Sequence, residues 1–91
     1  MTRLTFVTRN GCHLCEAARA HVDAVLARPG LSVALAVLDV DADPALRSEY
    51  GDQVPVVLVD GELHSFFEVD PDRLLADLRV RAEASRTATG R

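Results

Sequence analysis

The chain has 91 residues, of which 48% are hydrophobic and 26% charged, and its formal net charge is −4. This length holds one hydrophobic core, so we expect one domain over residues 1–84, followed by a flexible polar tail over 85–91. The acidic balance and the absence of a basic cluster exclude a nucleic-acid surface. No secretory leader pattern and no apolar run of membrane-spanning length is present, so the sequence predicts a cytoplasmic protein without membrane contact.

The first half of the chain reads as a strand, a helix and a second strand. Residues 3–8 are short and rich in Thr, Phe and Val, which is typical of a strand. Apolar residues then recur every three or four positions over 12–27, and a Pro-Gly pair ends this predicted helix. Residues 32–40 are apolar on both faces, which predicts a strand covered on both sides. The strand–helix–strand order places the two strands side by side and parallel.

The second half adds a helix, two strands and a last helix. A short helix is predicted over 44–50, where an Asp-Pro pair supplies the cap and a first-turn proline. Residues 54–59 and 62–67 form antiparallel strands joined by an Asp-Gly turn, and a second Asp-Pro pair opens the last helix. Phe66 and Phe67 should point to opposite faces of the last strand, with one of them in the core. The other could border a substrate groove, although a place in the core or under a helix is favoured. The order β-α-β-α-β-β-α predicts an α/β fold with a four-stranded mixed sheet flanked by helices.

The two cysteines of the chain, Cys12 and Cys15, stand two residues apart at the predicted start of the first helix. Gly11 can release the chain from the strand into a tight turn, so the helix begins beside Cys12. The unpaired N–H groups and the dipole of a helix start favour a thiolate, which is the nucleophile of disulfide exchange. Cys15 lies on the same helical face, one turn on, where a disulfide with Cys12 is feasible. The pattern therefore predicts a reversible dithiol/disulfide centre.

Three other interpretations of the cysteine pair are weaker. Two buried structural cysteines would explain Cys15 but not Cys12 at the mouth of a helix. A zinc site would require a second C-x-x-C or a pair of histidines at helical spacing, and neither is present. Covalent haem requires His directly after the second cysteine, where the chain has Glu16. We therefore predict no metal and no cofactor.

The cysteine motif and the Val54-Pro55 pair that opens the third predicted strand resemble the thioredoxin fold. Within that fold, residues 3–80 are similar to glutaredoxin-like proteins, in particular to a family of short bacterial ones. A Thr-Arg pair precedes the motif, where glutaredoxins carry Thr or Ser followed by Lys. Thioredoxins have a buried acid six residues before their nucleophile, and the chain has Phe6 there. This residue favours the glutaredoxin side of the resemblance.

The resemblance implies a thiol-disulfide oxidoreductase in which Cys12 attacks and Cys15 resolves the mixed disulfide. Its partner would be a disulfide-containing protein or a small thiol. The resemblance also implies that Val54 and Pro55 contact the substrate and that the bond between them is cis.

Two charged or ionisable side chains flank the predicted nucleophile. Arg9 carries a permanent positive charge near the thiolate. His13 directly follows Cys12, so a protonated ring would stabilise the thiolate; equally, this position suits a solvent-exposed histidine in a first helical turn. Both interpretations of His13 stay open.

Glutathione stays open as a partner. Glutaredoxins that bind it carry a Gly-Gly-x-Asp-like turn before the last helix, where this chain has the segment 68–71, Glu-Val-Asp-Pro. The carboxylate of Glu68 would repel an anionic tripeptide, and Pro71 lacks an amide donor. Two alternative functions remain: a binding module whose cysteines do not exchange, and an iron–sulfur carrier ligated as a dimer with glutathione. The missing turn weakens the iron–sulfur alternative. We expect a monomer.

Overall fold

The computed structural model describes residues 1–89, and their side chains through residue 84. It contains the predicted elements in the predicted order. These are β1 (Thr2–Thr8), α1 (His13–Leu26), β2 (Val33–Asp39), a 3₁₀ turn η1 (Val40–Ala42), α2 (Pro44–Tyr50), β3 (Val56–Val59), β4 (Glu62–Phe66) and α3 (Pro71–Thr89). The turn η1 has no counterpart in the sequence prediction. It arises where the Asp39 carboxylate accepts a hydrogen bond from the Asp41 N–H at 2.9 Å and bends the chain after β2.

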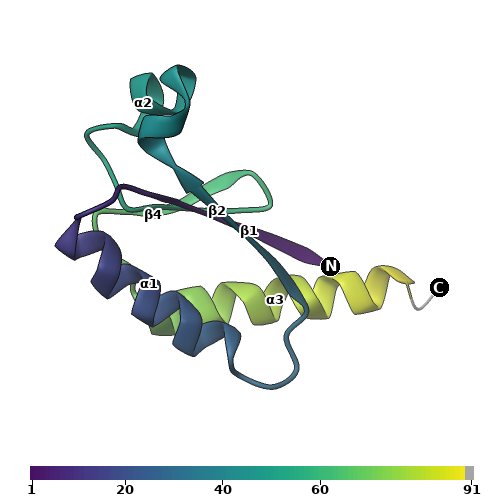
Figure 1. Ribbon diagram of the computed structural model, residues 1–91. Coiled ribbons are helices and arrows are strands. Elements are labelled where there is room, and N and C mark those ends of the chain that lie inside the picture. The colour runs from purple at the N-terminus through teal and green to yellow at the C-terminus, as the bar shows by residue number, and fades with distance from the viewer. Residues whose placement is uncertain (90–91) are drawn as a thin grey trace.

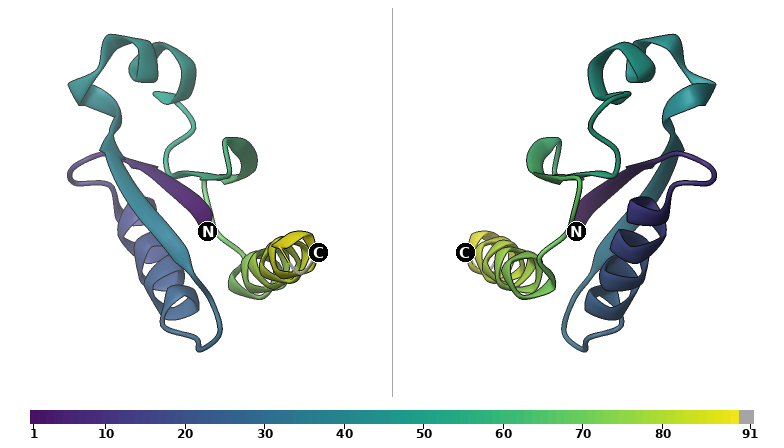
Figure 2. Two further views of the ribbon diagram at one scale, coloured as in Figure 1. Left: turned by 90° about the vertical axis from the view of Figure 1, so that its right-hand side faces the viewer. Right: turned by 90° about the vertical axis from the view of Figure 1, so that its left-hand side faces the viewer.

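The four strands form one mixed sheet in the order β2-β1-β3-β4. β1 pairs parallel with β2 and antiparallel with β3, and β3 pairs antiparallel with β4. Helices α1 and α3 lie together on one side of this sheet, whereas α2 stands beyond the end of β2 on the other side (Figures 1 and 2). The predicted α/β fold and its mixed four-stranded sheet are therefore confirmed.

The prediction that residues 32–40 form a strand covered on both faces is wrong. β2 is an edge strand, and Val37 and Leu38 are 43% and 37% exposed. The sequence shows only that this strand is apolar throughout. Whether it lies at the centre or at the edge of the sheet depends on which side of β1 the strand β3 pairs with. Because β3 joins the far side of β1, the centre of the core lies over β1 and β3.

Two apolar clusters hold the domain together. The larger one packs α1 and α3 on the sheet, and its centre contains Phe6, Leu74 and Leu78, each at most 1% exposed. The smaller one lies at the end of β1 that leads into the cysteine motif. Its buried members are Val7, Cys15, Val40, Val54 and Val56, and the α2 side chains Leu46 and Tyr50 pack against them. One of the two cysteines is thus part of the core.

The predicted turn and cap residues have the expected geometry. Asp60 and Gly61, between β3 and β4, both have positive φ, 51° and 82°, as the tightest β-hairpins require. The Asp43 carboxylate accepts a hydrogen bond from the Ala45 N–H at 2.8 Å and caps α2. Asp70 does the same for α3, accepting from the N–H groups of residues 72 and 73 at 3.1 and 3.2 Å.

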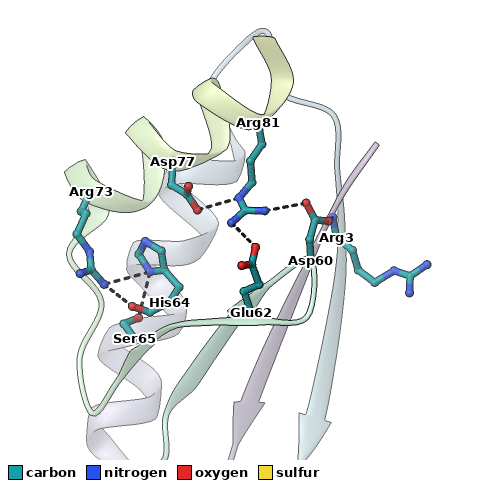
Figure 3. Close-up of polar contacts among 8 residues, drawn as sticks. All are labelled: Arg3, Asp60, Glu62, His64, Ser65, Arg73, Asp77 and Arg81. Carbon is teal, nitrogen blue, oxygen red and sulfur yellow. Dashed lines mark hydrogen bonds and ion pairs between the residues drawn. The ribbon is translucent and has the colours of Figure 1, made fainter. Parts of the chain in front are cut away.

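Polar contacts fasten α3 to the β3–β4 hairpin (Figure 3). The Arg81 guanidinium donates to three carboxylates at 3.0–3.1 Å, those of Asp77 on α3, Asp60 in the turn and Glu62 on β4. About two turns nearer the start of α3, Arg73 donates to the backbone oxygen of His64. These contacts fix the angle at which α3 leaves the sheet.

His64 occupies a β-bulge beneath α3. Leu58 pairs with Leu63 and Val57 with Ser65, so His64 is the extra residue on β4. Its ring points toward α3 (Figure 3), and its Nε2 is buried without a hydrogen-bond partner among the described residues. Burial lowers the pKa of His64, and the charges of Arg73 and Arg81 lower it further, whereas Asp77 and Asp70 oppose the shift.

Protonation of His64 should therefore weaken the fold. Because its pKa in the folded chain is lower than in the unfolded chain, the stability that neutral His64 contributes is present above the unfolded value of about 6.5 and is lost as the pH falls through the folded value. We expect the urea midpoint of the wild type to fall between about pH 7.5 and about pH 5.5, and to fall less in His64→Leu. His21→Leu, at an exposed position on α1, is the control and should keep the wild-type drop. An equal drop in His64→Leu would contradict this role.

Helix α3 continues through Thr89, into the segment 85–91 that the sequence predicts as a tail; residues 90 and 91 of that segment lie outside the described residues. Within the described part of the chain, none of the helices combines the length and the apolar character needed to cross a membrane.

Candidate active site

Cys12 is the N-cap residue of α1. Its backbone is extended, with φ −95° and ψ 114°, and its Sγ accepts a hydrogen bond from the Cys15 N–H at 3.2 Å. Gly11, with φ 75°, makes the turn from β1 into this position. The sulfur therefore lies at the start of the helix, where the first N–H groups have no intrahelical partner. Cys12 is half-buried, so a substrate can reach it.

Cys15 lies one turn further along α1 and faces the core. It is 3% exposed, and both cysteines are free thiols in the structure. Burial raises the pKa of the Cys15 thiol and its hydrogen bond with Cys12 raises it further, while hydrogen bonding with the Thr8 side chain and the Arg9 backbone opposes the shift. The two cysteines thus differ in their surroundings: Cys12 is accessible, whereas Cys15 is buried and its thiol pKa is raised.

This difference predicts selective alkylation. In the reduced native protein, iodoacetamide should modify Cys12 about tenfold faster than Cys15 or more, because Cys15 is buried and its thiol pKa is raised. Peptide mass spectrometry over a time course gives both rates, and the guanidinium-denatured protein is the control in which the two rates should converge. Equal rates in the native protein would show that the two cysteines are not differentiated.

Arg9 lies beside the motif but its guanidinium is already paired. It donates to both oxygens of Asp41, at 2.9 and 3.2 Å, and to the backbone oxygen of Gly51 at 3.1 Å. Arg47 adds a second cation to Asp41 at 3.3 Å. Arg9 therefore ties the cysteine loop to η1 and to the end of α2, and its charge near Cys12 is shared with a carboxylate.

His13 follows Cys12 in the first turn of α1 and points into solvent. Its side chain is 99% exposed, and its Nδ1 lies 3.6 Å from a carboxylate oxygen of Glu16. This placement matches the exposed-histidine interpretation, and the ring's charged neighbour is Glu16.

The Val54–Pro55 bond is cis, as the resemblance implied. Val54 packs in the apolar cluster that also contains Cys12 and Cys15, and Pro55 is fully buried behind it. Among the described residues, no hydrogen bond engages the backbone N–H or C=O of Val54, although its neighbours Gln53 and Pro55 both accept from Phe67. An extended backbone segment beside Cys12 therefore retains unpaired polar groups.

A surface hollow of about 330 Å³ opens directly at the two cysteines. Arg9 and Glu16 line it, together with Arg19, whose guanidinium donates to Asp23 at 2.9 Å. A wider hollow of about 610 Å³ lies elsewhere, between β4 and the start of α3, and no cysteine lines it. Over the part of the chain that the structure describes, no group of three or more His, Cys, Asp or Glu side chains is placed to hold a metal ion.

Comparison with known proteins places the chain in a family. A family model described as Glutaredoxin-like domain (DUF836) matches residues 3–79. The chain belongs to this glutaredoxin-like family. An uncharacterized protein of Mycobacterium tuberculosis is 38% identical over 79 residues, which cover 84% of this chain and 81% of that protein.

Two solved structures support the fold of this glutaredoxin-like protein. A structural-genomics target protein from X. campestris is 32% identical, with a TM-score of 0.67 over 85% of this chain and 96% of the other. A mutant thioredoxin from Halobacterium salinarum is 26% identical, with a TM-score of 0.64 over 87% of this chain and 73% of the other.

Three features of the site in this glutaredoxin-like protein were not predicted. Asp41 pairs with Arg9, which lies 32 positions earlier in the sequence. The contact depends on the position of η1, which the sequence did not predict. The prediction that Phe66 and Phe67 point to opposite faces, with one in the core, is wrong: both are exposed and their ring centroids are 5.1 Å apart. Phe67 has φ 70°, so strand alternation ends at Phe66. No signal in the sequence marks a phenylalanine for a left-handed backbone.

Proposed function

We propose that this glutaredoxin-like protein is a thiol-disulfide oxidoreductase, with Cys12 as the attacking thiolate and Cys15 as the resolving thiol. The observation that carries the proposal is the unlike environment of two cysteines one helical turn apart. Cys12 is accessible and its sulfur accepts a helix N–H, whereas Cys15 is buried and its thiol pKa is raised. A pair of merely structural cysteines does not require this asymmetry.

The first step joins Cys12 to the substrate. The Cys12 thiolate attacks one sulfur of a substrate disulfide; a new S–S bond forms as the old one breaks, and the other half of the substrate leaves as a thiolate that takes up a proton. The first-turn N–H groups of α1 stabilise the attacking thiolate before this step. Cys15 stays protonated meanwhile because of its raised pKa, so it does not compete for the substrate.

The second step releases the product. Cys15 gives up its proton, to water or to the departing sulfur, and attacks Cys12 Sγ. A Cys12–Cys15 disulfide forms, and the remaining half of the substrate leaves as a thiol. Two electrons have moved from the cysteine pair to the substrate, and a dithiol or two monothiols must return them.

The Val54–Pro55 segment supplies a place for the substrate backbone. Val54 packs near both cysteines, and its N–H and C=O are unpaired among the described residues. An extended peptide that pairs with these groups would lie across Cys12. Arg9 then acts on the site by fixing the cysteine loop to Asp41 and Gly51, rather than by touching the substrate.

Reaction with a small disulfide tests the proposal. Reduced protein mixed with bis(2-hydroxyethyl) disulfide should release two mercaptoethanol molecules per chain and become lighter by the mass of two hydrogen atoms. We expect the rate at pH 7 to exceed that of a free cysteine peptide by about tenfold or more, because the helix start favours the thiolate. A protein that keeps both thiols, or that reacts no faster than the peptide, would rule the proposal out.

A further inference from the structure

Two of the three phenylalanines lie together on the surface beside the cis-proline segment. Phe6 is in the core at 1% exposed, whereas Phe66 and Phe67 are 46% and 44% exposed. Their rings meet edge to face, at 72° between planes and 5.1 Å between centroids. Single exposed apolar residues are common on proteins, but two exposed aromatic rings in contact form a surface of the kind found at binding sites.

The aromatic pair is anchored directly to the segment that flanks Cys12. The Phe67 N–H donates to the backbone oxygens of Pro55 at 2.9 Å and Gln53 at 3.3 Å, and Phe66 lies opposite Val56 in the sheet. Val56 and Cys12 belong to the same apolar cluster. A surface formed by the two rings is therefore continuous with the backbone that would receive a substrate.

The backbone at Phe67 makes this placement costly for the fold. Its φ of 70° lies in the left-handed region, where glycine is favoured and a bulky residue is an outlier. The residue nevertheless remains 44% exposed. A position that suits glycine but carries an exposed aromatic ring is better explained by a contact with another molecule than by folding.

The charges around the cysteines indicate which kind of molecule this is. Cations that line the hollow are already paired, Arg9 with Asp41 and Arg19 with Asp23. The carboxylate of Glu16, 75% exposed, also lines this hollow, and the exposed Glu68 follows the aromatic pair. A small anionic substrate would therefore find an acidic rim, whereas an apolar, uncharged or basic polypeptide segment would not be repelled.

We propose that Phe66 and Phe67 form a docking surface for an apolar side chain that flanks the cysteine of an extended protein substrate. The inference rests on the proposed function and names its substrate class. A peptide strand paired with Val54 advances about 3.3 Å per residue, so the residues that flank its reacting cysteine would run beside the Gln53–Pro55 segment to which Phe67 is hydrogen-bonded. The aromatic faces desolvate such a side chain, while the backbone pairing holds the sulfur in line with Cys12.

Two model peptides test the docking surface. Both carry one cysteine as a mixed disulfide with mercaptoethanol and differ only in a flanking residue, which is Leu in one and Ser in the other. The wild type should prefer the Leu peptide by about tenfold in kcat/KM, mainly through KM. In Phe66→Ala and Phe67→Asn this ratio should fall toward one; asparagine is chosen because it tolerates a left-handed backbone. Leu63→Ala, at a 55% exposed position on the same strand, should keep the wild-type ratio.

The outcomes separate the two proposals. Failure of the wild type to exchange with bis(2-hydroxyethyl) disulfide overturns the oxidoreductase function and this inference with it. If the wild type does exchange with that small disulfide, the oxidoreductase function stands, and any of three results overturns the docking surface alone. Neither peptide reacts, or the wild type shows no preference for the Leu peptide, or Phe66→Ala and Phe67→Asn both keep the wild-type ratio.

Discussion

Replacing Cys12 by serine should abolish disulfide exchange, with a loss of about a thousandfold or more, because a serine hydroxyl is not ionised at neutral pH and forms no disulfide. Cys15→Ser is the matched variant one turn away on the same helix. It should still attack a substrate disulfide, but the product should remain bound to Cys12, since the resolving thiol is missing. Mass spectrometry of both variants after reaction with bis(2-hydroxyethyl) disulfide distinguishes an unmodified chain from a trapped mixed disulfide.

The pattern of trapping decides the roles. In the Cys12→Ser variant, Cys15 could also form an adduct with the substrate. If this adduct formed as fast as the adduct on Cys12 in the Cys15→Ser variant, Cys12 would not be the preferred attacking thiol. The structure predicts otherwise because Cys15 is 3% exposed and its thiol pKa is raised by burial.

Phe6→Ala should cost about 3–5 kcal/mol of unfolding free energy, through lost burial and a cavity that the surrounding side chains cannot fill. Phe6 is 1% exposed and lies where the sheet meets both α1 and α3. A domain of this length has about 5–14 kcal/mol of stability in total, so the variant should be close to unfolding at 37 °C. Urea denaturation followed by far-UV circular dichroism measures the change.

Val80→Ala is the control for this substitution. Val80 lies on α3 and is 66% exposed, so its truncation should change stability by less than about 0.5 kcal/mol. A Phe6→Ala protein as stable as Val80→Ala would show that the larger apolar cluster is not the main source of stability.

The sequence predicted the fold well because the decisive signals are local. Asp-Gly at residues 60 and 61 specifies a hairpin through its backbone preferences, and the two Asp-Pro pairs specify helix starts. The cysteine motif at a strand-to-helix junction needed only its neighbours to be recognised. These features depend on a few consecutive residues, so no knowledge of the tertiary structure was required.

The features that sequence reasoning missed depend on distant partners. The edge position of β2 follows from where β3 adds to the sheet, and the Arg9–Asp41 pair joins residues 32 positions apart. The bulge at His64 shifts the register of β4 without a glycine or proline to mark it. Phe67 has a left-handed backbone, and its N–H donates to the oxygens of Pro55 and Gln53, which lie 12 and 14 positions earlier in the chain.

Equilibration of the protein with graded mixtures of glutathione and glutathione disulfide tests the central claim most directly. After acid quenching and alkylation, mass spectrometry gives the fraction of chains that carry the Cys12–Cys15 disulfide. We expect a reversible transition that involves two electrons, so the ratio of oxidised to reduced protein should change tenfold for each change of about 30 mV in the potential of the glutathione mixture. Two thiols that stay free across the whole series, or glutathione adducts on Cys12 that never convert to the internal disulfide, would contradict a dithiol/disulfide centre.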